Sequence, residues 1–209
     1  MPRRGKKTPA TVSLQQTARD AQRAAVLEAA STLLEAEGPT ALTVRRLADA
    51  VGASTMMIYT LFGGKDGLAA ALHAEGFARL SAAIVGVPPR ADRPLEWLLA
   101  IADAYRDCAL ANRSFYLLMH FPVLAGCEPP GAERIREERG WQVLEQAIRA
   151  AIDCKALPAG TRAVVVADAL WGVVHGMVSL ELAGYFPGER TAAPRFRAAV
   201  RAIVAGFAS

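Results

Sequence analysis

Cysteine is scarce in this sequence, and long uncharged apolar runs are missing. The 209 residues include three cysteines, which lie far apart and form no Cys-x-x-Cys pair. Such usage argues against a disulfide scaffold and a zinc site, and it is typical of a reducing cytosol. The most apolar segment, 163–183, is interrupted by Asp168, His175 and Glu181, so we predict no membrane span. No apolar run follows the basic N-terminus, so we also expect no secretory signal.

The sequence also lacks the motifs of common enzyme classes. It has no His-Glu-x-x-His and no Gly-x-Ser-x-Gly, and Gly-Gly-Lys-Asp at 63–66 lacks the upstream glycine and the hydroxyl residue of a phosphate-binding loop. The three histidines are scattered at no metal-ligand spacing. His120 and Cys127 could act as base and nucleophile, but no third group is evident to orient them. We therefore expect no catalytic residue, no metal and no cofactor.

The positive charge is concentrated at one end of a globular composition, which is 53% apolar and 21% charged. The net charge of +4 lies wholly in residues 1–65, which hold nine Lys or Arg and five Asp or Glu. A basic N-terminal third on a neutral body favours a nucleic-acid-binding head. Four of these cations, Arg3, Arg4, Lys6 and Lys7, stand in the first seven residues, and a solvated tail explains them equally well.

The pattern of apolar residues predicts an all-α fold. Apolar side chains recur at steps of three and four between Gly and Pro breakers, and no strand alternation of useful length occurs. Residues 1–16 carry few apolar side chains and are predicted to form a disordered basic arm. We expect about nine helices, at about 17–37, 44–51, 55–62, 65–85, 94–110, 112–120, 132–154, 161–183 and 192–206.

Two of these helices have the pattern of a helix-turn-helix. The short helix at 44–51 is followed by Gly52 and Ala53, and Gly52 tolerates the positive φ that ends a helix. The next helix begins with small or polar residues and hides Ile58 and Phe62. A short helix, a tight turn and a second helix that can enter the major groove are what this motif requires.

The same region resembles a known family. Residues 43–68, TVRRLADAVGASTMMIYTLFGGKDGL, are similar to the TetR family of bacterial transcriptional regulators. The chain departs from the family pattern at Met56 and Met57, where Gly-Thr is usual, and at Leu61, where His is usual; Gly63 stands where Pro is frequent. The matching positions are Thr43, Leu47, Ala48, Gly52, Ser54, Tyr59, Phe62, Lys65, Asp66 and Leu68.

A second resemblance lies near the C-terminus. Residues 169–186, ALWGVVHGMVSLELAGYF, are similar to the Trp-x-x-x-His-Gly segment of one C-terminal ligand-binding class of that family. Together the resemblances imply a homeodomain-like helix-turn-helix domain at 17–66 and a helical ligand-binding and dimerisation domain at 67–209. They also imply a homodimer that binds double-stranded operator DNA and an unknown small-molecule effector.

The resemblance places the helix at 55–62 in the major groove and implies a set of DNA contacts. Arg45 can bond a guanine edge through two hydrogen bonds, and Met57 offers at most apolar contact with thymine methyls. Lys65 is a point charge for phosphate beside helix N-terminal amides. Tyr59 can donate its hydroxyl to a phosphate or pack its ring in the core, and the basic arm can enter the minor groove or stay solvated. The implied DNA-binding residues are Thr43, Arg45, Ser54, Thr55, Met57, Tyr59, Thr60 and Lys65.

The C-terminal domain is expected to supply an interface and a pocket. Members of the family pair their last two helices in a four-helix bundle, and small residues let helices approach closely. The implied dimer-interface residues are Gly172, Gly176, Ser179, Phe196, Val200 and Ile203. Aromatic and Met side chains suit an apolar or aromatic ligand; such stripes are also typical of a core, and Trp171 with His175 fits core packing better. The candidate ligand-binding residues are Trp97, Tyr105, Phe115, Tyr116, Met119, His120, Trp141, Trp171 and His175.

These observations favour one function and leave one alternative. The favoured function is a cytoplasmic repressor that binds a near-palindromic operator as a homodimer, with its two heads about one helical turn, ~34 Å, apart. A small apolar or aromatic molecule would release it. The alternative is a small all-α ligand-binding or enzymatic module whose DNA-binding head is vestigial, and the departures at Met57 and Leu61 favour it.

Overall fold

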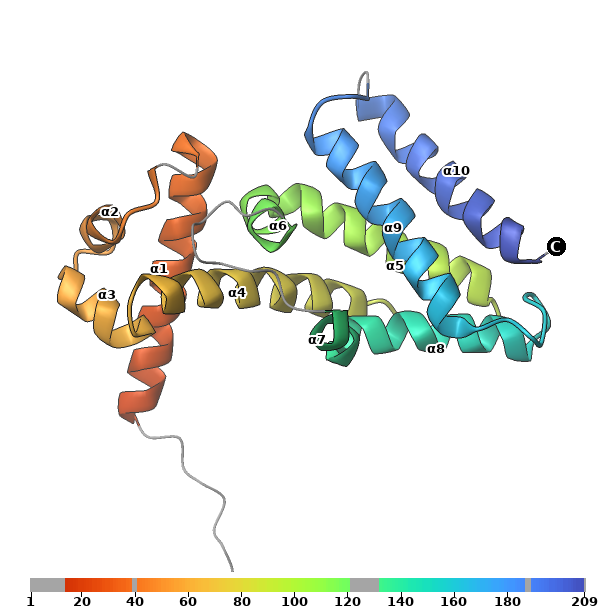
Figure 1. The fold of residues 1–209 in the computed structure, drawn as a ribbon, viewed down its shortest axis with the longest axis horizontal. Helices are drawn as coiled ribbons and strands as arrows, with labels where there is room; N and C mark the ends of the chain where they lie inside the picture. Colours follow the sequence, from red (N-terminus) through yellow and green to blue (C-terminus); the bar gives the residue numbers. More distant parts are fainter. Residues whose placement is uncertain (1–13, 39–40, 121–131, 187–188, 209) are drawn as a thin grey trace, which may run out of the picture. The chain divides into compact units, whose positions relative to one another are not determined.

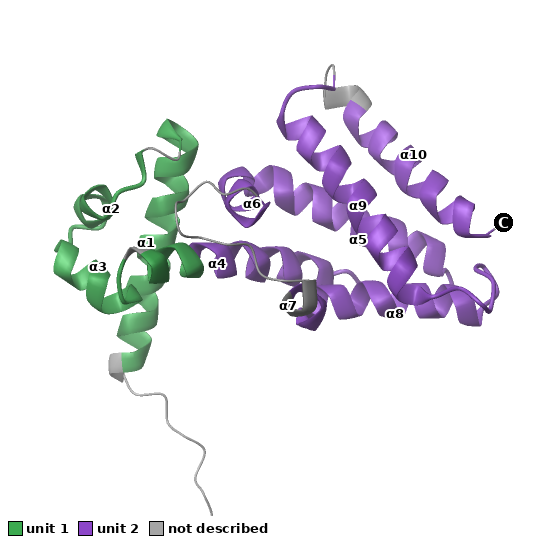
Figure 2. Ribbon diagram, viewed as in Figure 1, with its two compact units in different colours: residues 1–71 green, residues 72–209 purple. Residues whose placement is uncertain are grey.

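The chain folds into helices throughout the part that the structure describes. A computed structural model describes residues 14–38, 41–120, 132–186 and 189–208, and within these ranges it contains ten α-helices and no strand (Figure 1). The all-α prediction is confirmed. The chain divides into two compact units, residues 1–71 and 72–209 (Figure 2), whereas we placed the boundary at residue 66.

The first unit is a small helical bundle. It comprises α1 (Leu14–Glu37), α2 (Val44–Ala50), α3 (Thr55–Phe62) and the start of α4 (Lys65–Val85). Helices α1, α2 and α3 pack on one another in pairs. The helix α1 begins at Leu14, so residues 14–16 are helical rather than part of the predicted arm, and residues 1–13 lie outside the described part of the chain. The buried apolar residues of α1, α2 and α3 are Val26, Leu27, Ala30, Leu34, Leu47, Ala48, Ile58, Leu61 and Phe62.

Side-chain caps and a glycine fix the turn between α2 and α3. The Thr43 hydroxyl accepts a hydrogen bond from the Arg46 N–H at 3.3 Å, and the Ser54 hydroxyl accepts one from the Met57 N–H at 3.2 Å. Both bonds satisfy amides that the first turn of a helix leaves without a partner. Gly52 has φ of 64°, which closes α2 at little steric cost. The two caps and the glycine therefore form the short turn between two helices that the helix-turn-helix pattern predicts.

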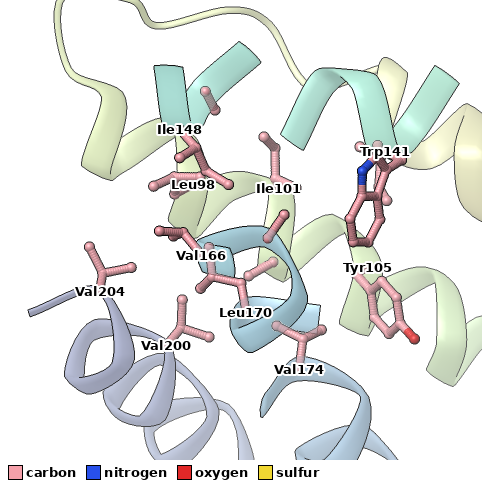
Figure 3. Packing of buried hydrophobic residues seen from close by; sticks show 14 of the residues in the cluster. Leu98, Ile101, Tyr105, Trp141, Ile148, Val166, Leu170, Val174, Val200 and Val204 are labelled. Atoms are coloured by element: carbon pink, nitrogen blue, oxygen red, sulfur yellow. The ribbon is translucent and has the colours of Figure 1, made fainter. Parts of the chain in front are cut away.

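The second unit surrounds a larger apolar core. It contains the rest of α4, with α5 (Pro94–Ala111), α6 (Arg113–His120), α7 (Ala132–Glu137), α8 (Arg139–Asp153), α9 (Ala163–Leu182) and α10 (Glu189–Ala208). Helix α5 packs against α8, α9 and α10, and α10 also lies along α9. Figure 3 shows how side chains of these helices meet in the core, among them Leu98, Ile101, Ile148, Val166, Leu170 and Val200.

Ion pairs link α5 to the two C-terminal helices. Arg106 on α5 pairs with Glu181 on α9, and both side chains are largely buried. The Glu181 carboxylate raises the pKa of the Arg106 guanidinium. Arg197 on α10 pairs with Asp103 on α5 at 2.9 Å. The Arg106–Glu181 pair holds α9 against α5, because breaking a largely buried pair leaves a charge without compensation. The Arg197–Asp103 pair is more exposed and contributes little.

The structure splits one predicted helix. We predicted a single helix at 132–154, but α7 ends at Glu137, Glu138 has the extended conformation (φ −66°, ψ 139°), and α8 begins at Arg139. The Gly140 N–H donates a hydrogen bond to the Ser81 hydroxyl at 3.0 Å. A Cβ on Gly140 would lie 3.1 Å from the Ser81 Cα. Close packing of α8 on α4 therefore sets the break, which makes ten helices rather than nine in the described part of the chain.

Two helices, α4 and α9, are long and strongly apolar. Residues 66–85 of α4 and the whole of α9 are long and apolar enough to cross a membrane by length and composition alone. Core helices of soluble proteins pass the same test, and α9 contributes Val166, Leu170 and Val178 to the core. Only 28% of the apolar stretch of α9 is buried. Much of this helix is therefore left uncovered by its own chain.

Candidate functional site

Helix α3 presents an exposed face that suits DNA contact. Ile58, Leu61 and Phe62 are buried, whereas the other side of the helix faces outward. Tyr59 is 46% exposed, so it occupies the surface rather than the core. The exposed residues of α3 are Thr55, Met56, Tyr59 and Thr60.

The two methionines at the start of α3 differ in exposure. Met56 is 70% exposed, whereas Met57 is half-buried. Successive helical residues are rotated by about 100°, so Met56 falls beside Tyr59 and Thr60 on the outer face and Met57 falls at its margin. The structure thus adds Met56 to the predicted DNA-binding face and moves Met57 to its edge.

Arg45 and Arg46 occupy different environments. Both guanidinium Nη atoms of Arg46 bond the two carboxylate oxygens of Glu37 at the end of α1. This pairing lowers the pKa of Glu37 and raises that of Arg46. Arg45 is exposed, and no ion pair holds it within the described residues. Of the two arginines, Arg45 is therefore the one available for DNA.

Two arginines that the sequence analysis did not single out bind the end of α3. Arg19 donates to the Thr60 carbonyl at 3.2 Å, and Arg23 donates to the Leu61 carbonyl. The Arg23 guanidinium also lies 4.5 Å from the centre of the Phe62 ring. Cations suit the negative C-terminal end of a helix. Their four-residue spacing on α1 was the available signal, since it places both on one face of that helix.

The structure describes the hydroxyl groups of three further predicted DNA-binding residues, but not the side chain of Lys65. The Thr43 and Ser54 hydroxyls accept the capping bonds described above and keep their protons for other acceptors. The Thr60 hydroxyl donates to the Met56 carbonyl at 2.9 Å, which leaves it free to accept. Helix α4 begins at Lys65, whose side chain lies outside the described part of the chain.

A second candidate site is an apolar cavity of about 80 Å³ in the second unit, several times the space that one water molecule needs. Two of its walls are Trp141 and Trp171, whose rings meet edge to face with centroids 6.0 Å apart. Figure 3 shows Trp141 close to Tyr105. The lining residues are Phe77, Leu80, Ser81, Ile84, Leu98, Ala102, Tyr105, His120, Ile135, Glu138, Gly140, Trp141, Leu144, Leu170, Trp171 and Val174.

The cavity takes in four of the nine predicted ligand-binding residues. Tyr105, His120, Trp141 and Trp171 line it. The side chains of the other five pack elsewhere in the unit, and their part in ligand binding stays a prediction. Trp97 belongs to the apolar core, and His175 bonds Tyr116. The residues Phe115, Tyr116 and Met119 instead line a separate space of about 10 Å³.

The three histidines, which are scattered in the sequence, gather in the structure. The His120 and His175 ring centroids are 4.3 Å apart, and the Phe77 ring packs on both His73 and His120, at 5.0 and 6.0 Å from them. The Tyr116 hydroxyl lies 2.8 Å from His175 Nδ1. Within the described residues no group of three His, Cys, Asp or Glu is arranged to hold a metal ion, and Cys127 falls outside them.

Burial determines the protonation states beside the cavity. Burial lowers the pKa of His120 to about 3, and the neighbouring His175 and His73 contribute to the same shift. Burial also lowers the pKa of His175 and raises that of the Tyr105 hydroxyl. At neutral pH these groups are therefore uncharged.

Helix α9 has an open face on the side away from the cavity. A Cβ added to Gly172 or Gly176 would meet no atom within 4 Å among the described residues. At about 100° per residue, these glycines lie roughly opposite Leu170 and Val174, which line the cavity. Val165 and Leu180, on the same side as the glycines, are 42% and 44% exposed.

The other predicted interface residues are less available. Phe196 and Val200 on α10 are buried in the core of their own chain, where Figure 3 shows Val200 beside Val166. They cannot also be the surface that meets a partner, because their side chains already pack inward. Ile203 is partly buried, and the Ser179 hydroxyl lies 3.5 Å from both Tyr116 Oη and His175 Nε2.

Two family models match the chain. One, described as "Tetracyclin repressor-like, C-terminal domain", matches residues 98–203, about half of the sequence. The other, described as "Bacterial regulatory proteins, tetR family", matches residues 26–72 and so covers α2 and α3. The chain belongs to the TetR family. TetR-family regulators bind DNA operators as dimers and respond to small-molecule effectors. Membership of the Trp-x-x-x-His-Gly class stays a prediction.

Solved structures share this TetR-family fold. A protein of unknown function from Rhodococcus sp. RHA1 is 25% identical, with a TM-score of 0.70 over 90% of this chain and 95% of that chain. The TetR family regulator PfmR from Thermus thermophilus is 22% identical, with a TM-score of 0.66 over 86% and 97%. A TetR variant from Acinetobacter baumannii AYE, solved in complex with minocycline, is 22% identical, with a TM-score of 0.57 over 87% and 93%. No curated protein sequence matches the chain.

Proposed function

We propose that this TetR-family regulator is a cytoplasmic homodimeric repressor, which binds a near-palindromic operator through α3 and is released by a small apolar or aromatic molecule. One observation carries the proposal: a single chain of this family has both parts of such a switch. The exposed face of α3 is the first part. The second is the apolar cavity lined by Trp141 and Trp171.

The proposed operator contacts come from Arg45 and the outer face of α3. Arg45 is the residue suited to a guanine, because a guanidinium can donate two hydrogen bonds to its major-groove edge. The Thr55 hydroxyl can donate or accept, whereas Thr60 is left to accept because its proton goes to the Met56 carbonyl. The Met56 side chain extends outward and suits the methyl group of thymine. Tyr59 presents its hydroxyl from the surface and suits a phosphate.

The proposed dimer forms through the open face of α9. The stripe of Val165, Gly172, Gly176 and Leu180 lacks bulky side chains at its centre, and its one charged neighbour on the same row, Asp168, is paired with Arg136 of the same chain. A second copy of the same stripe would cover it in an isologous contact. This pairing explains why α9 is apolar well beyond the part that its own core buries. Reading successive major grooves requires the two heads of such a dimer to lie ~34 Å apart.

Release is proposed to act through α9. A ligand in the cavity contacts Leu170 and Val174 on one side of the helix, and the interface uses the opposite side. A ligand that favours a different arrangement of the two subunits shifts the population away from the DNA-binding state. The size of the shift is limited by the difference in ligand affinity between the two states.

The experiment that tests this function is enrichment of bound sequences from a random duplex DNA pool by the purified protein. A recovered near-palindrome supports a dimer that reads sequence. Binding that is sensitive to salt and blind to sequence contradicts it. The recovered operator is then placed over a reporter promoter, where a repressor lowers expression and an activator raises it.

A further inference from the structure

Two positive charges meet the end of α3 without an acidic partner. Arg19 and Arg23 lie one turn apart on α1, and both donate to carbonyls at the C-terminal end of α3. Within the described residues no ion pair holds either guanidinium, and the adjacent Asp20 carboxylate accepts from Gln16 at 2.8 Å instead. Carbonyl groups are dipoles and do not cancel full charges, and like charges four residues apart in a helix repel one another. An anion from outside the chain would therefore be stabilised here.

The two arginines differ in how far the fold covers them. Arg23 is half-buried, and its guanidinium lies over the Phe62 ring, 4.5 Å from the ring centre. Arg19 is exposed, and it donates one hydrogen bond from Nη2 to the Thr60 carbonyl at 3.2 Å. A guanidinium carries several N–H donors in a planar fork, so most of those on Arg19 remain available. Arg19 is therefore the arginine of this pair that a second acceptor can reach.

The position of Arg19 at the end of α3 determines which part of a DNA duplex it can meet. A helix with its side chains is about 10–12 Å across, and the major groove is about 12 Å wide, so a helix in the groove has a phosphate strand close on either side. The first residues of a recognition helix contact bases, and the C-terminal end of such a helix can contact the backbone. A cation bonded to the last carbonyls of α3, as Arg19 is, therefore lies where phosphates are expected rather than base edges.

The charge distribution of the first unit leaves a part for Arg19. Helix α3 contains no charged residue, so the cations that neutralise phosphates around it come from other elements. Side chains of four arginines are described in this unit. Arg46 is paired with an acid and Arg23 is half-buried, which leaves Arg45 on α2 and Arg19 on α1. A guanidinium matches a phosphate well, because it can donate two parallel hydrogen bonds to it.

We propose that Arg19 binds a backbone phosphate of the operator at the C-terminal end of α3, while one of its N–H groups keeps the hydrogen bond to the Thr60 carbonyl. The contact carries no sequence information, and it fixes the register of α3 on the duplex. Because the carbonyl already holds the guanidinium, less side-chain freedom is lost when DNA binds. This inference rests on the proposed function, since it requires α3 to lie in the major groove.

The test measures how DNA affinity depends on salt, by fluorescence anisotropy of the full-length protein on the selected operator and on a random-sequence duplex. Arg19→Gln removes the charge and keeps an N–H donor for the Thr60 carbonyl. Each lost phosphate contact lowers the slope of log affinity against log salt by about 0.9, so a dimer that loses two should lose about 2. Affinity should fall by about tenfold or more on both duplexes alike, because phosphate contacts do not depend on sequence. Arg19→Lys keeps the charge and should keep most of the slope.

Arg23→Gln is the matched control, because it removes the same charge one turn further along α1 and changes a bond of the same kind. Its guanidinium is half-buried against Phe62, so we expect a lower melting temperature and a salt slope close to that of the parent. An unchanged slope in Arg19→Gln overturns the proposal, because Arg19 would then only bind the end of α3. Equal decreases of slope in the two variants also overturn it, because they would report the overall charge of the head and no particular contact.

Failure of the proposed function gives a different result. A protein that selects no operator can still bind duplex DNA through phosphates, and the slopes on the random-sequence duplex then decide the Arg19 contact by themselves. A slope lowered by Arg19→Gln and not by Arg23→Gln supports the contact even then. If the parent protein binds neither duplex, both the proposed function and the phosphate contact are wrong.

Discussion

At the scale of single residues, ion pairing separates two neighbouring arginines. Arg46 is held by the Glu37 carboxylate, and Arg45 extends from α2 without such a partner in the described residues. A guanidinium without a protein partner gives up only water and side-chain freedom when it binds a base edge. A paired guanidinium must first give up its carboxylate. This difference makes Arg45 and Arg46 a matched pair for mutagenesis.

We expect Arg45→Ala to lower operator affinity by about tenfold or more, because a bidentate contact with a base is worth about 1–3 kcal/mol. Arg46→Ala should leave operator affinity close to that of the parent, with a small loss of stability from the exposed ion pair. Fluorescence anisotropy on the selected operator measures both affinities at one salt concentration. Comparable losses in the two variants would mean that Arg45 reads no base.

Stability should depend on pH through His120. Its pKa is about 3 in the folded chain and about 6.5 in the unfolded chain. Below about pH 6.5 the His120 side chain is therefore protonated in the unfolded chain but not in the folded chain. Its contribution lowers the free energy of unfolding by about 1.4 kcal/mol for each pH unit, down to the folded pKa. Urea unfolding at about pH 7.5, 6.0 and 5.0, values that bracket the unfolded pKa, should show a shallower loss for His120→Gln than for the parent. Parallel pH profiles would show that His120 does not titrate this way.

At the scale of elements, local patterns predict the helices and tertiary packing decides the details. Apolar periodicity and glycine breakers indicate where α1 to α6, α9 and α10 lie. The break at Glu138 has no such local signal, because it follows from Gly140 packing against Ser81, which is 59 residues away in sequence. Local capping predicts Thr43 and Ser54 correctly, since their partners lie three residues further on.

The candidate sites could be predicted from sequence only as far as helix faces allow. The outer face of α3 follows from the positions of Ile58 and Phe62. The cavity does not follow, because aromatic side chains at helical spacing line a core and a cavity alike. Tyr105 and Tyr116 illustrate this limit: both are buried on neighbouring helices, yet Tyr105 lines the cavity and Tyr116 bonds His175. Which aromatic faces the cavity depends on helix packing across the unit.

The open face of α9 leads to a prediction about assembly. Gly176→Arg places a long cation where the structure has open space within one chain, so the subunit should fold with an unchanged helical circular dichroism spectrum. The same cation opposes the proposed pairing, because two copies would meet across an apolar contact. We expect a monomer by analytical ultracentrifugation and roughly a hundredfold loss of operator affinity, since half of the phosphate and base contacts are lost. Gly160→Arg, which adds the same charge in the open turn before α9, should stay dimeric, and a dimeric Gly176→Arg would place the interface elsewhere.

At the scale of the whole molecule, the family assignment joins two sites that the structure describes separately. The chain connection between the two units runs through α4, which begins at Lys65 directly after the α3 turn. The same helix contributes Phe77, Leu80 and Ile84 to the cavity wall. A ligand in this cavity would therefore contact both the helix that leads to the DNA-binding head and the helix that is proposed to form the dimer. Operator DNA should weaken effector binding by the same factor by which the effector weakens operator binding.

The spacing of operator half-sites tests the dimer as a whole. In the proposed dimer, two heads held by one interface would read successive major grooves, so their half-sites would lie about 10 base pairs apart. Inserting about five base pairs, half a helical turn, turns the second half-site to the opposite side of the duplex. The parent protein should then bind no better than it binds a single half-site, with a shallower dependence on salt because fewer phosphates are neutralised. The Gly176→Arg monomer should bind both operators equally. If the parent tolerates the insertion, its two heads are not held at a fixed separation, and release by a change in that separation cannot be how the effector acts.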